Sequence, residues 1–498
     1  TTTLTGFNLT IRSYAAEAGD SDLQESLMPI TDDIYRTSGD RNITITLTSG
    51  RYYEFSIIPV FSNLTDRGIA VATSGARVLI VIPPSLPDLD GDGVADVDDV
   101  DDDGDGLIEI RTADEFNMIR NNLAGTNLTA TVIADGNDSG CGNGADITGC
   151  TGYELMNNIS LSSYPNWIPI GTDQNKYTAI FDGNNNTISD INITTATEDR
   201  VGLFASLGST SEVRNLRLSQ VAISVENNFV GALAGEAGAA LINNIGVTNI
   251  NINGSSNVGG LLGGLNGGSI ANSSVREGVV LATNSSAGGL VGSSQSGSID
   301  SSFTRLQTII ATVDSAGGLI GSGSDQLTIT SSYAQTGLVE AVVNAGGILG
   351  YAGFLGSVML ENSYAQIGTL RVYGNYSGSI IGRSNGTITV DITNSYGVMG
   401  MLENPAPESA GGLASSSMNL NIVNSYWDTN VTFTNSMITS DGRRTGNQTT
   451  AALQASAGDI YSNWDSSVWD FGEDTEYPAL LNLIGSTPAE QRSFIIRR

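Results

Sequence analysis

The sequence feature that most constrains the fold is a short glycine motif that recurs eight times between Val201 and Ser415. It reads VGGLLG at 258–263, AGGLVG at 287–292 and AGGLIG at 316–321. Its first glycines lie 28 to 33 residues apart, at Gly202, Gly231, Gly259, Gly288, Gly317, Gly346, Gly378 and Gly411. A nearly fixed period of this length is typical of proteins built from stacked structural repeats.

A second pattern recurs with the same period: an apolar residue followed two positions later by Asn or Ser. The pairs are Val213/Asn215, Ile242/Asn244, Ile270/Asn272, Ile299/Ser301, Ile329/Ser331, Leu360/Asn362, Ile392/Asn394 and Ile422/Asn424. In the later copies an aromatic residue follows two positions further on, at Phe303, Tyr333, Tyr364, Tyr396 and Tyr426. One copy, 259–287, holds three short apolar runs separated by turns, and none is long enough for an ordinary helix. The repeat predicts three short strands per coil and an all-β fold dominated by a right-handed parallel β-helix.

Stacking of the coils determines which side chains meet. One coil cannot bury its inward Leu and Ile residues, but stacked coils can. Equivalent residues then lie at the inter-strand spacing of about 4.8 Å, so we expect Leu261, Leu290 and Leu319 to stack. We also expect the repeated Asn side chains to point inward and to hydrogen-bond from coil to coil, as in cross-β ladders. The repeated tyrosines are interpreted as packing ladders rather than as platforms for sugars.

The motif resembles the GLUG repeat of bacterial secreted and surface proteins. The flanks resemble the same family, with WIPIG at 167–171, FDGNNNTISDINI at 181–193 and NSYWD at 424–428. The resemblance covers the segment 107–480 and implies a β-helix in an extracellular or cell-surface protein. It implies no particular activity, because one fold hosts many functions.

The remaining segments give the predicted domain organisation. Residues 1–84 alternate in polarity and resemble a fibronectin type III β-sandwich, which is incomplete because Thr5-Gly6-Phe7 resembles that family's third strand. An Asp-rich linker follows at 85–110. The segment 111–200 is predicted to form an N-terminal cap and early coils, with a helix at 111–122 that carries a Thr112/Glu115 capping box. The β-helix proper occupies 201–440, and 441–498 is predicted to be a C-terminal cap and tail.

The linker carries two calcium-loop patterns. Asp88, Asp90, Asp92, Asp96 and Asp99 have the alternate spacing of an EF-hand loop, with Gly93 at its sharp turn. The pattern recurs 13 residues further on, at Asp101, Asp103, Asp105 and Glu109. No amphipathic helix flanks either copy, so the stretch resembles the calcium loops of thrombospondin type 3 repeats. We expect Ca²⁺ as the bound ion; the alternative is a disordered acidic linker.

Composition excludes some partners. The net charge is −31, with 21 basic and 52 acidic residues and no histidine. A nucleic-acid partner is not expected, because phosphate binding needs a basic surface, and no apolar run is long enough to insert into a membrane. We expect an extracellular or cell-surface location, with any signal peptide already removed. Cys141 and Cys150 suit a disulfide in an oxidising compartment; two thiols without histidine make a poor zinc site.

Function is less constrained than fold. The repeats are poor in carboxylates and the chain has no histidine, so no histidine base or catalytic triad exists. Asp182 and Asp428 are expected to be exposed carboxylates that belong to the repeat signature, and we do not predict an enzyme. The prediction is a structural or adhesive surface protein; the alternative is a carbohydrate-binding or polysaccharide-degrading β-helix. Expected partners are surface glycans and other copies of the chain, joined head to tail through the tail residues Ser493, Phe494, Ile495 and Ile496.

Overall fold

The computed structural model describes residues 101, 103–126, 150–374, 376–385, 388–403, 410–415, 419–430, 432–433, 446–456, 459–494 and 496, and the backbone of four strands between residues 3 and 81. These residues divide into two compact units near Gly104. The first unit contains a four-stranded sheet in the order β2-β1-β3-β4, whose pairs are all antiparallel. Its strands are β1 (Thr3–Ala15), β2 (Ile34–Thr37), β3 (Arg51–Ser62) and β4 (Arg77–Val81). The predicted sandwich is therefore represented, in the part of the chain that the structure describes, by one sheet.

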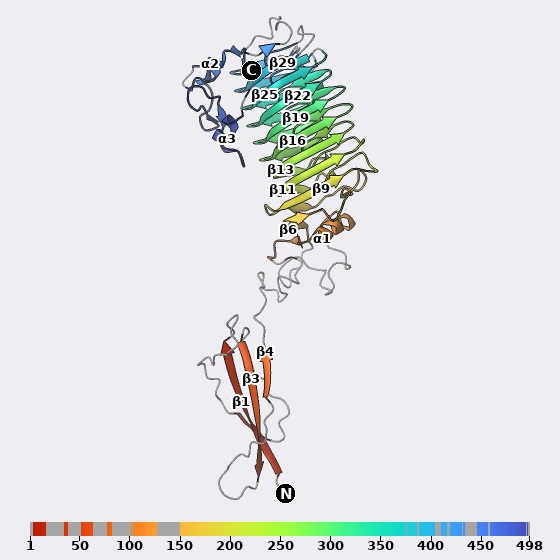
Figure 1. The fold of residues 1–498 in the computed structure, drawn as a ribbon, viewed down its shortest axis with the longest axis vertical. Helices are drawn as coiled ribbons and strands as arrows, with labels where there is room; N and C mark the ends of the chain where they lie inside the picture. The colour runs from red at the N-terminus through yellow and green to blue at the C-terminus, as the bar shows by residue number, and fades with distance from the viewer. Residues whose placement is uncertain are drawn as a thin grey trace. The chain divides into compact units, whose positions relative to one another are not determined.

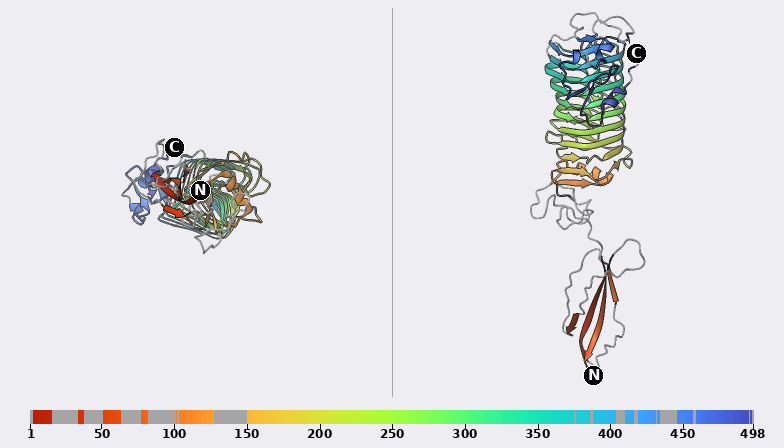
Figure 2. Two further views of the ribbon diagram at one scale, coloured as in Figure 1. Left: turned by 90° about the horizontal axis from the view of Figure 1, so that it is seen from below. Right: turned by 90° about the vertical axis from the view of Figure 1, so that its left-hand side faces the viewer.

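The second unit is a parallel β-solenoid of about nine turns, in which equivalent strands lie one above another (Figures 1 and 2). Its early strands are β5 (Leu107–Ile110), β6 (Gly152–Leu155), β7 (Ile159–Ser160), β8 (Ile180–Asp182), β9 (Thr187–Ile193), β10 (Phe204–Leu207), β11 (Glu212–Ser224), β12 (Ala234–Ala237) and β13 (Leu241–Gly254). The central ones are β15 (Leu262–Ala271), β16 (Ser274–Ala282), β18 (Val291–Asp300), β19 (Phe303–Ala311), β21 (Ile320–Thr330), β22 (Tyr333–Ala341), β24 (Leu349–Glu361) and β25 (Tyr364–Val372). The late ones are β27 (Ile381–Ser384), β28 (Thr389–Thr393), β29 (Tyr396–Glu403), β30 (Leu420–Val423), β31 (Tyr426–Asp428), β32 (Thr432–Phe433) and β33 (Asn447–Gln448).

A smaller parallel sheet runs along a third side of the solenoid. It consists of β14 (Val258–Gly259), β17 (Ala287–Gly288), β20 (Ser315–Gly317), β23 (Asn344–Gly346) and β26 (Tyr376–Gly378). A central turn therefore contains three strands, such as β17, β18 and β19, as the repeat predicted. The first two apolar runs of the copy 259–287 are not separated by a turn as expected, because β15 continues through them as one strand with register shifts between Leu265 and Ser269.

The glycine motif brings the turns into close contact. Leu261, Leu290 and Leu319 are fully buried and stacked as predicted. The N–H of Leu261 donates to the carbonyl of Leu290, and the N–H of Leu290 to the carbonyl of Leu319, both at 2.9 Å. A Cβ on the preceding Gly289 would lie 2.2 Å from the carbonyl oxygen of Gly318. Only glycine fits there, because the backbones of adjacent turns touch at this corner.

The repeated Asn residues do not form the inward ladder that we expected. They lie at a corner with φ between 45° and 57°, in the left-handed region that Asn tolerates better than most residues. Their side chains are half-buried rather than internal. Two neighbouring pairs bond directly, Asn244 to Asn215 at 2.8 Å and Asn424 to Asn394 at 3.4 Å. The asparagine is therefore used mainly for its backbone conformation.

The internal polar ladder is built instead by the serine that follows each corner residue from Asn272 onward. The serines are Ser273, Ser302, Ser332, Ser363, Ser395 and Ser425, and all are buried. The backbone N–H of each of the first five donates to the Oγ of the next, at 3.1 Å in every case. Each Oγ donates to the carbonyl two residues before it, as Ser332 does to Thr330 at 2.6 Å. Backbone groups that the corner removes from the sheet are thereby satisfied.

A short helix covers the N-terminal end of the solenoid, as predicted. Helix α1 (Ala113–Met118) begins at Thr112 with the expected capping box and continues into η1 (Ile119–Asn121). Phe116 is fully buried and stacks on Trp167, with ring centroids 5.3 Å apart. Helix α1 lies beside β6 at this end of the solenoid (Figure 1), and Phe116 covers the apolar interior there.

The described part of the C-terminal segment packs along the side of the solenoid (Figure 1). It contains α2 (Thr450–Leu453), η4 (Asp459–Tyr461), β34 (Trp469–Asp470), β35 (Ala479–Leu480) and α3 (Pro488–Arg492). The reason is a column of aromatic rings that point outward from β19, β22, β25 and β29. The rings are those of Phe303, Tyr333, Tyr364 and Tyr396, and the centroids of successive rings lie 4.7 to 4.9 Å apart. These rings would be exposed without the C-terminal segment.

The cover over the aromatic column is specific as well as apolar. Trp464 and Trp469 pack against the rings. The hydroxyl of Tyr396 donates to the carbonyl of Pro478 at 2.7 Å, and that of Tyr364 to Oε1 of Gln491 at 3.0 Å. The repeated tyrosines are thus packing residues, as their recurrence in the sequence indicated.

Candidate functional site

The second calcium-loop pattern gathers three of its four predicted ligands. Asp101, Asp103 and Asp105 offer carboxylate oxygens that all lie within 4.8 Å of one another. Asp101 is buried and the other two are exposed. Gly104 and Gly106 turn the chain with φ of 71° and 88°, and Oδ1 of Asp105 accepts the N–H of Leu107 at 2.8 Å. Three carboxylates so close together repel each other unless a cation or protons compensate, and Ca²⁺ at this cluster stays a prediction.

Glu109, the fourth predicted ligand, does not belong to this cluster. It lies on β5, in register with Glu154 on β6, which in turn aligns with Asp182 on β8. Its carboxylate is buried and forms an ion pair with Arg111. The first pattern, Asp88, Asp90, Asp92, Asp96 and Asp99, lies outside the described residues.

The structure describes only one of the two cysteines of the predicted disulfide. Cys150 is buried directly before β6, at 6% exposure. Cys141 lies outside the described residues, so the pairing stays a prediction.

The two carboxylates that we considered for catalysis are buried, contrary to our expectation that they are exposed. Asp182 is 8% exposed and accepts hydrogen bonds from Arg214 at 2.6 Å and from Asn215 at 3.1 Å. Asp428 is fully buried and accepts from Thr450 at 2.8 Å and from the hydroxyl of Tyr477 at 2.7 Å. Asp182 joins two neighbouring turns, and Asp428 joins the solenoid to the C-terminal segment. Both carboxylates therefore have a structural role.

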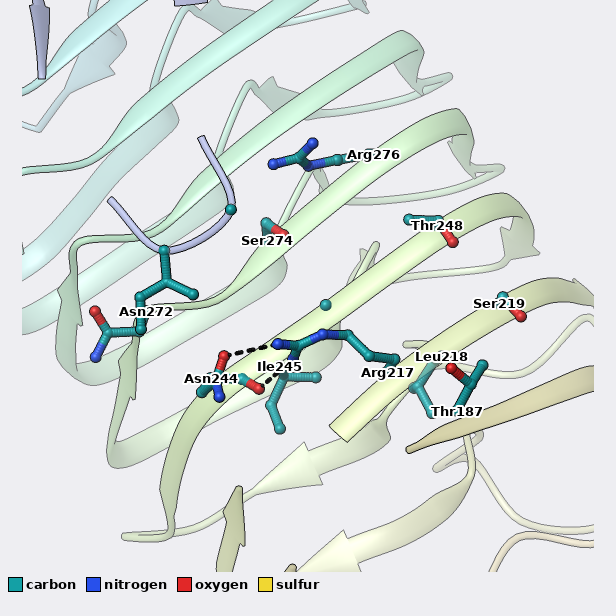
Figure 3. A pocket seen from close by; sticks show the side chains of 13 residues that line it. Thr187, Arg217, Leu218, Ser219, Asn244, Ile245, Thr248, Asn272, Ser274 and Arg276 are labelled. Atoms are coloured by element: carbon teal, nitrogen blue, oxygen red, sulfur yellow. Dashed lines mark hydrogen bonds between the residues drawn. The ribbon is translucent and has the colours of Figure 1, made fainter. Parts of the chain in front are cut away.

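A polar cleft that the sequence analysis did not find lies on the outer face of β11, β13 and β16 (Figure 3). Its volume is about 420 Å³. It contains two arginines, Arg217 and Arg276, and the C-terminal segment contributes one wall through Ile484 and Gly485. Burial lowers the pKa of the Arg217 guanidinium from its ordinary value. The sequence offered one indication of this cleft: basic residues are scarce in the chain, and Arg217 and Arg276 lie on the same face of the sheet, on β11 and β16.

Comparison with known proteins gives partial matches. No family model matches the chain. The chain is a β-solenoid protein. Over 90 residues it is 34% identical to a protein of Evansella cellulosilytica described as a Gly-rich membrane protein. That match covers 17% of this chain and 10% of the relative, so the chain spans only a small part of the relative's length.

Two solved structures resemble the fold at low identity. A structure from Bacteroides ovatus, described as an immunoglobulin A1 protease, is 16% identical with a TM-score of 0.42, covering 75% of this chain and 92% of that one. Another, described as an IgA1 protease, is 12% identical with a TM-score of 0.38, covering 86% of this chain and 29% of that one. At these values the likenesses carry no argument about activity. Within the described residues, no helix has the length and apolar character needed to cross a bilayer.

Proposed function

We propose that this chain is an extracellular structural and adhesive protein, a rod of the GLUG type without catalytic activity of its own. The observation that carries the proposal is the use of the repeated side chains. The leucines fill the interior, the serines satisfy the backbone at the corners, and the aromatic residues hold the C-terminal segment. Repeats used in this way maintain a shape, which is the requirement of a protein that spans a distance and presents a surface.

The experiment compares binding with turnover. The purified chain, immobilised on beads, is presented with an array of surface glycans and with bacterial and host cell surfaces, while the same glycans and a panel of peptides are analysed for cleavage products. We expect retention on at least one surface without product release. Multiple turnovers of any substrate, abolished by Asp182→Asn or Asp428→Asn in a protein that remains folded, would overturn the proposal in favour of a degradative enzyme.

Calcium is part of the proposal. It is supported by the cluster of Asp101, Asp103 and Asp105 within the described residues of the linker. In calorimetric titration with calcium chloride we expect binding at or below millimolar concentration, and its weakening in Asp103→Asn. The matched control is Asp325→Asn, which removes one carboxylate at a position with φ of 54° that suits Asn. No heat of binding in the intact chain would favour the acidic-linker alternative.

Head-to-tail association of copies remains a prediction. Ser493 accepts a hydrogen bond from Arg305 at 3.1 Å, and Ile496 packs on the aromatic cluster of its own chain. A tail that served a second copy would first have to leave these contacts. Sedimentation of the intact chain and of a variant without residues 487–498 tests the idea, since a polymer that survives the deletion does not use the tail.

A further inference from the structure

The polar cleft continues the surface on which the C-terminal segment docks. The outward column of aromatic rings ends at Phe303. On the preceding strands the positions aligned with Phe303 are occupied by Ser274, Gly246, Arg217 and Thr187. The C-terminal segment covers the aromatic part, and its turn at Ile484 and Gly485 forms the boundary. Beyond that boundary the same sheet face is open, half-buried and polar (Figure 3).

Arg217 is held in the cleft by neutral groups. Its Nη1 donates to the carbonyl of Asn244 at 2.8 Å, and its Nη2 donates to Oδ1 of Asn244 at 3.1 Å. The side chain lies across Gly246, where a Cβ would be 2.9 Å from Cδ of Arg217. The glycine therefore leaves space for the arginine, and the hydrogen bonds fix its guanidinium. Its Nε–H has no hydrogen-bond partner among the described residues.

Arg276 is the second cation of the cleft. Its guanidinium lies 4.7 Å from the ring centroid of Phe303, and a Cβ on Gly485 would be 3.3 Å from Nη2. It makes no hydrogen bond or ion pair with any residue that the structure describes. Arg276 also acts on Glu490 through space, since it is among the causes that lower the pKa of that carboxyl, after the backbone hydrogen bond from Thr487.

Neither arginine of the cleft has a carboxylate partner among the described residues. Five other described arginines, Arg111, Arg200, Arg214, Arg371 and Arg492, form ion pairs with Asp or Glu, whereas Arg120, Arg305 and Arg383 stack on rings or bond to neutral groups. The chain has 52 acidic residues against 21 basic ones, so partners are abundant. A partly buried guanidinium loses hydration, and a charge in that position is normally compensated. The cleft thus holds two positive charges whose natural complement is an anion from outside the chain.

We propose that this cleft binds a carboxylate-bearing saccharide unit of an acidic glycan. The guanidinium groups of Arg217 and Arg276 match a carboxylate in charge. The Nη atoms of Arg217 already donate to Leu216, Asn244 and Asn185, so its Nε–H and the guanidinium of Arg276 are the groups that would donate to the carboxylate. The other walls carry Ser219, Thr248, Ser274 and Asn272, whose hydroxyl and amide groups both donate and accept, as sugar hydroxyls require. A volume of about 420 Å³ lies within the range of small-ligand sites. The site goes beyond the proposed structural role and does not depend on it.

The test uses the intact chain and two tetrasaccharide probes, one of hexuronic acid and one of the corresponding neutral hexose. In calorimetric titration we expect the acidic probe to bind with a dissociation constant below about 1 mM and the neutral probe at least about tenfold more weakly. Arg217→Gln and Arg276→Gln should each weaken the acidic probe by about tenfold or more, because each removes charge-assisted hydrogen bonds. Arg217→Lys, which keeps the charge but loses the fork, should fall between Arg217→Gln and the unaltered chain.

Arg383→Gln is the matched control. It removes the same charge from an arginine that stacks on Tyr376, 4.2 Å from its ring centroid, on a different column of the solenoid. Its affinity for the acidic probe should be unchanged. Equal binding of the two probes, equal losses in Arg217→Gln and Arg383→Gln, or no binding of the acidic probe at millimolar concentration would each overturn the proposal. Tighter binding of a peptide with the sequence of residues 88–110 than of the acidic probe would also overturn it and identify an acidic protein segment as the occupant.

Discussion

Replacing Gln491 by Ala should detach the C-terminal segment from the aromatic column. Gln491 is 1% exposed, and its side-chain amide makes two hydrogen bonds of 2.8 Å with the backbone of Leu480, one as donor and one as acceptor. Its Oε1 also accepts the hydroxyl of Tyr364 at 3.0 Å. Gln491 thereby joins α3, β35 and the solenoid through one amide group.

The magnitude follows from the groups that would lose their partner. Gln491→Ala leaves the N–H and carbonyl of Leu480 and the hydroxyl of Tyr364 buried without their hydrogen bonds. Each such group costs about 1–3 kcal/mol. The hydroxyl of Tyr364 can rotate and water can enter the space, so the low end applies, about 3–5 kcal/mol for the docking of the segment. A loss of this size increases the population of the detached state by more than about a hundredfold.

Hydrogen exchange read by mass spectrometry measures this directly. In Gln491→Ala, peptides from 459–494 should lose protection while peptides from 204–254 keep it. Acrylamide should also quench more tryptophan fluorescence, because Trp464 and Trp469 become accessible. The matched control is Gln307→Ala, an exposed glutamine on β19. Unchanged protection of 459–494 in Gln491→Ala would refute the reasoning, since the segment would then be held by its aromatic contacts alone.

Three further predictions concern the solenoid. Ser332→Ala removes the acceptor of the Ser302 N–H and should lower the free energy of unfolding by about 2 kcal/mol in urea titration; an effect equal to that of Ser301→Ala at the half-exposed corner would contradict the ladder. Leu290→Asp places a charge in the interior and should lower the free energy of unfolding by several kcal/mol, about enough to prevent folding of the central turns; circular dichroism would show this as a loss of β-sheet signal. Burial raises the pKa of Tyr364 and Tyr396 well above the ordinary value, so the unfolded chain releases these protons first. The stability they contribute is complete below about pH 10 and is lost as the pH rises above it; ultraviolet titration should show a set of tyrosines that ionise only on unfolding.

The glycine period was sufficient to predict the architecture. Stacking of Leu261, Leu290 and Leu319 follows from burial and inter-strand spacing, both of which act on every turn alike. The capping box at Thr112 was readable for a related reason, since its contacts are local in sequence.

The polar side chains were harder to assign from the sequence. Asn and Ser occur together at the corners of four copies, for example Asn362 and Ser363, and the pattern does not state which of them points inward. The left-handed backbone at the corner decides it, by turning Asn362 toward solvent and the following Ser363 toward the interior. The position of the C-terminal segment and the cleft at Arg217 depend on contacts between residues far apart in the chain, such as the 153 positions between Tyr333 and Ser486. No local pattern contains that information.

The C-terminal segment divides the solenoid into two regimes of cooperativity. Between β6 and β13 the described strand pairings join each turn to its immediate neighbours, and the bond from Asn244 to Asn185 across two turns is long, at 3.4 Å, so these turns can come apart in sequence from an end. Across β19 to β31, one segment bonds to Arg305 through Ser493 and to Asn424 through the indole of Trp464. Those turns must separate together or release the segment first. Under tension along its axis, the molecule would therefore lengthen turn by turn in its early part and resist as one block in its late part.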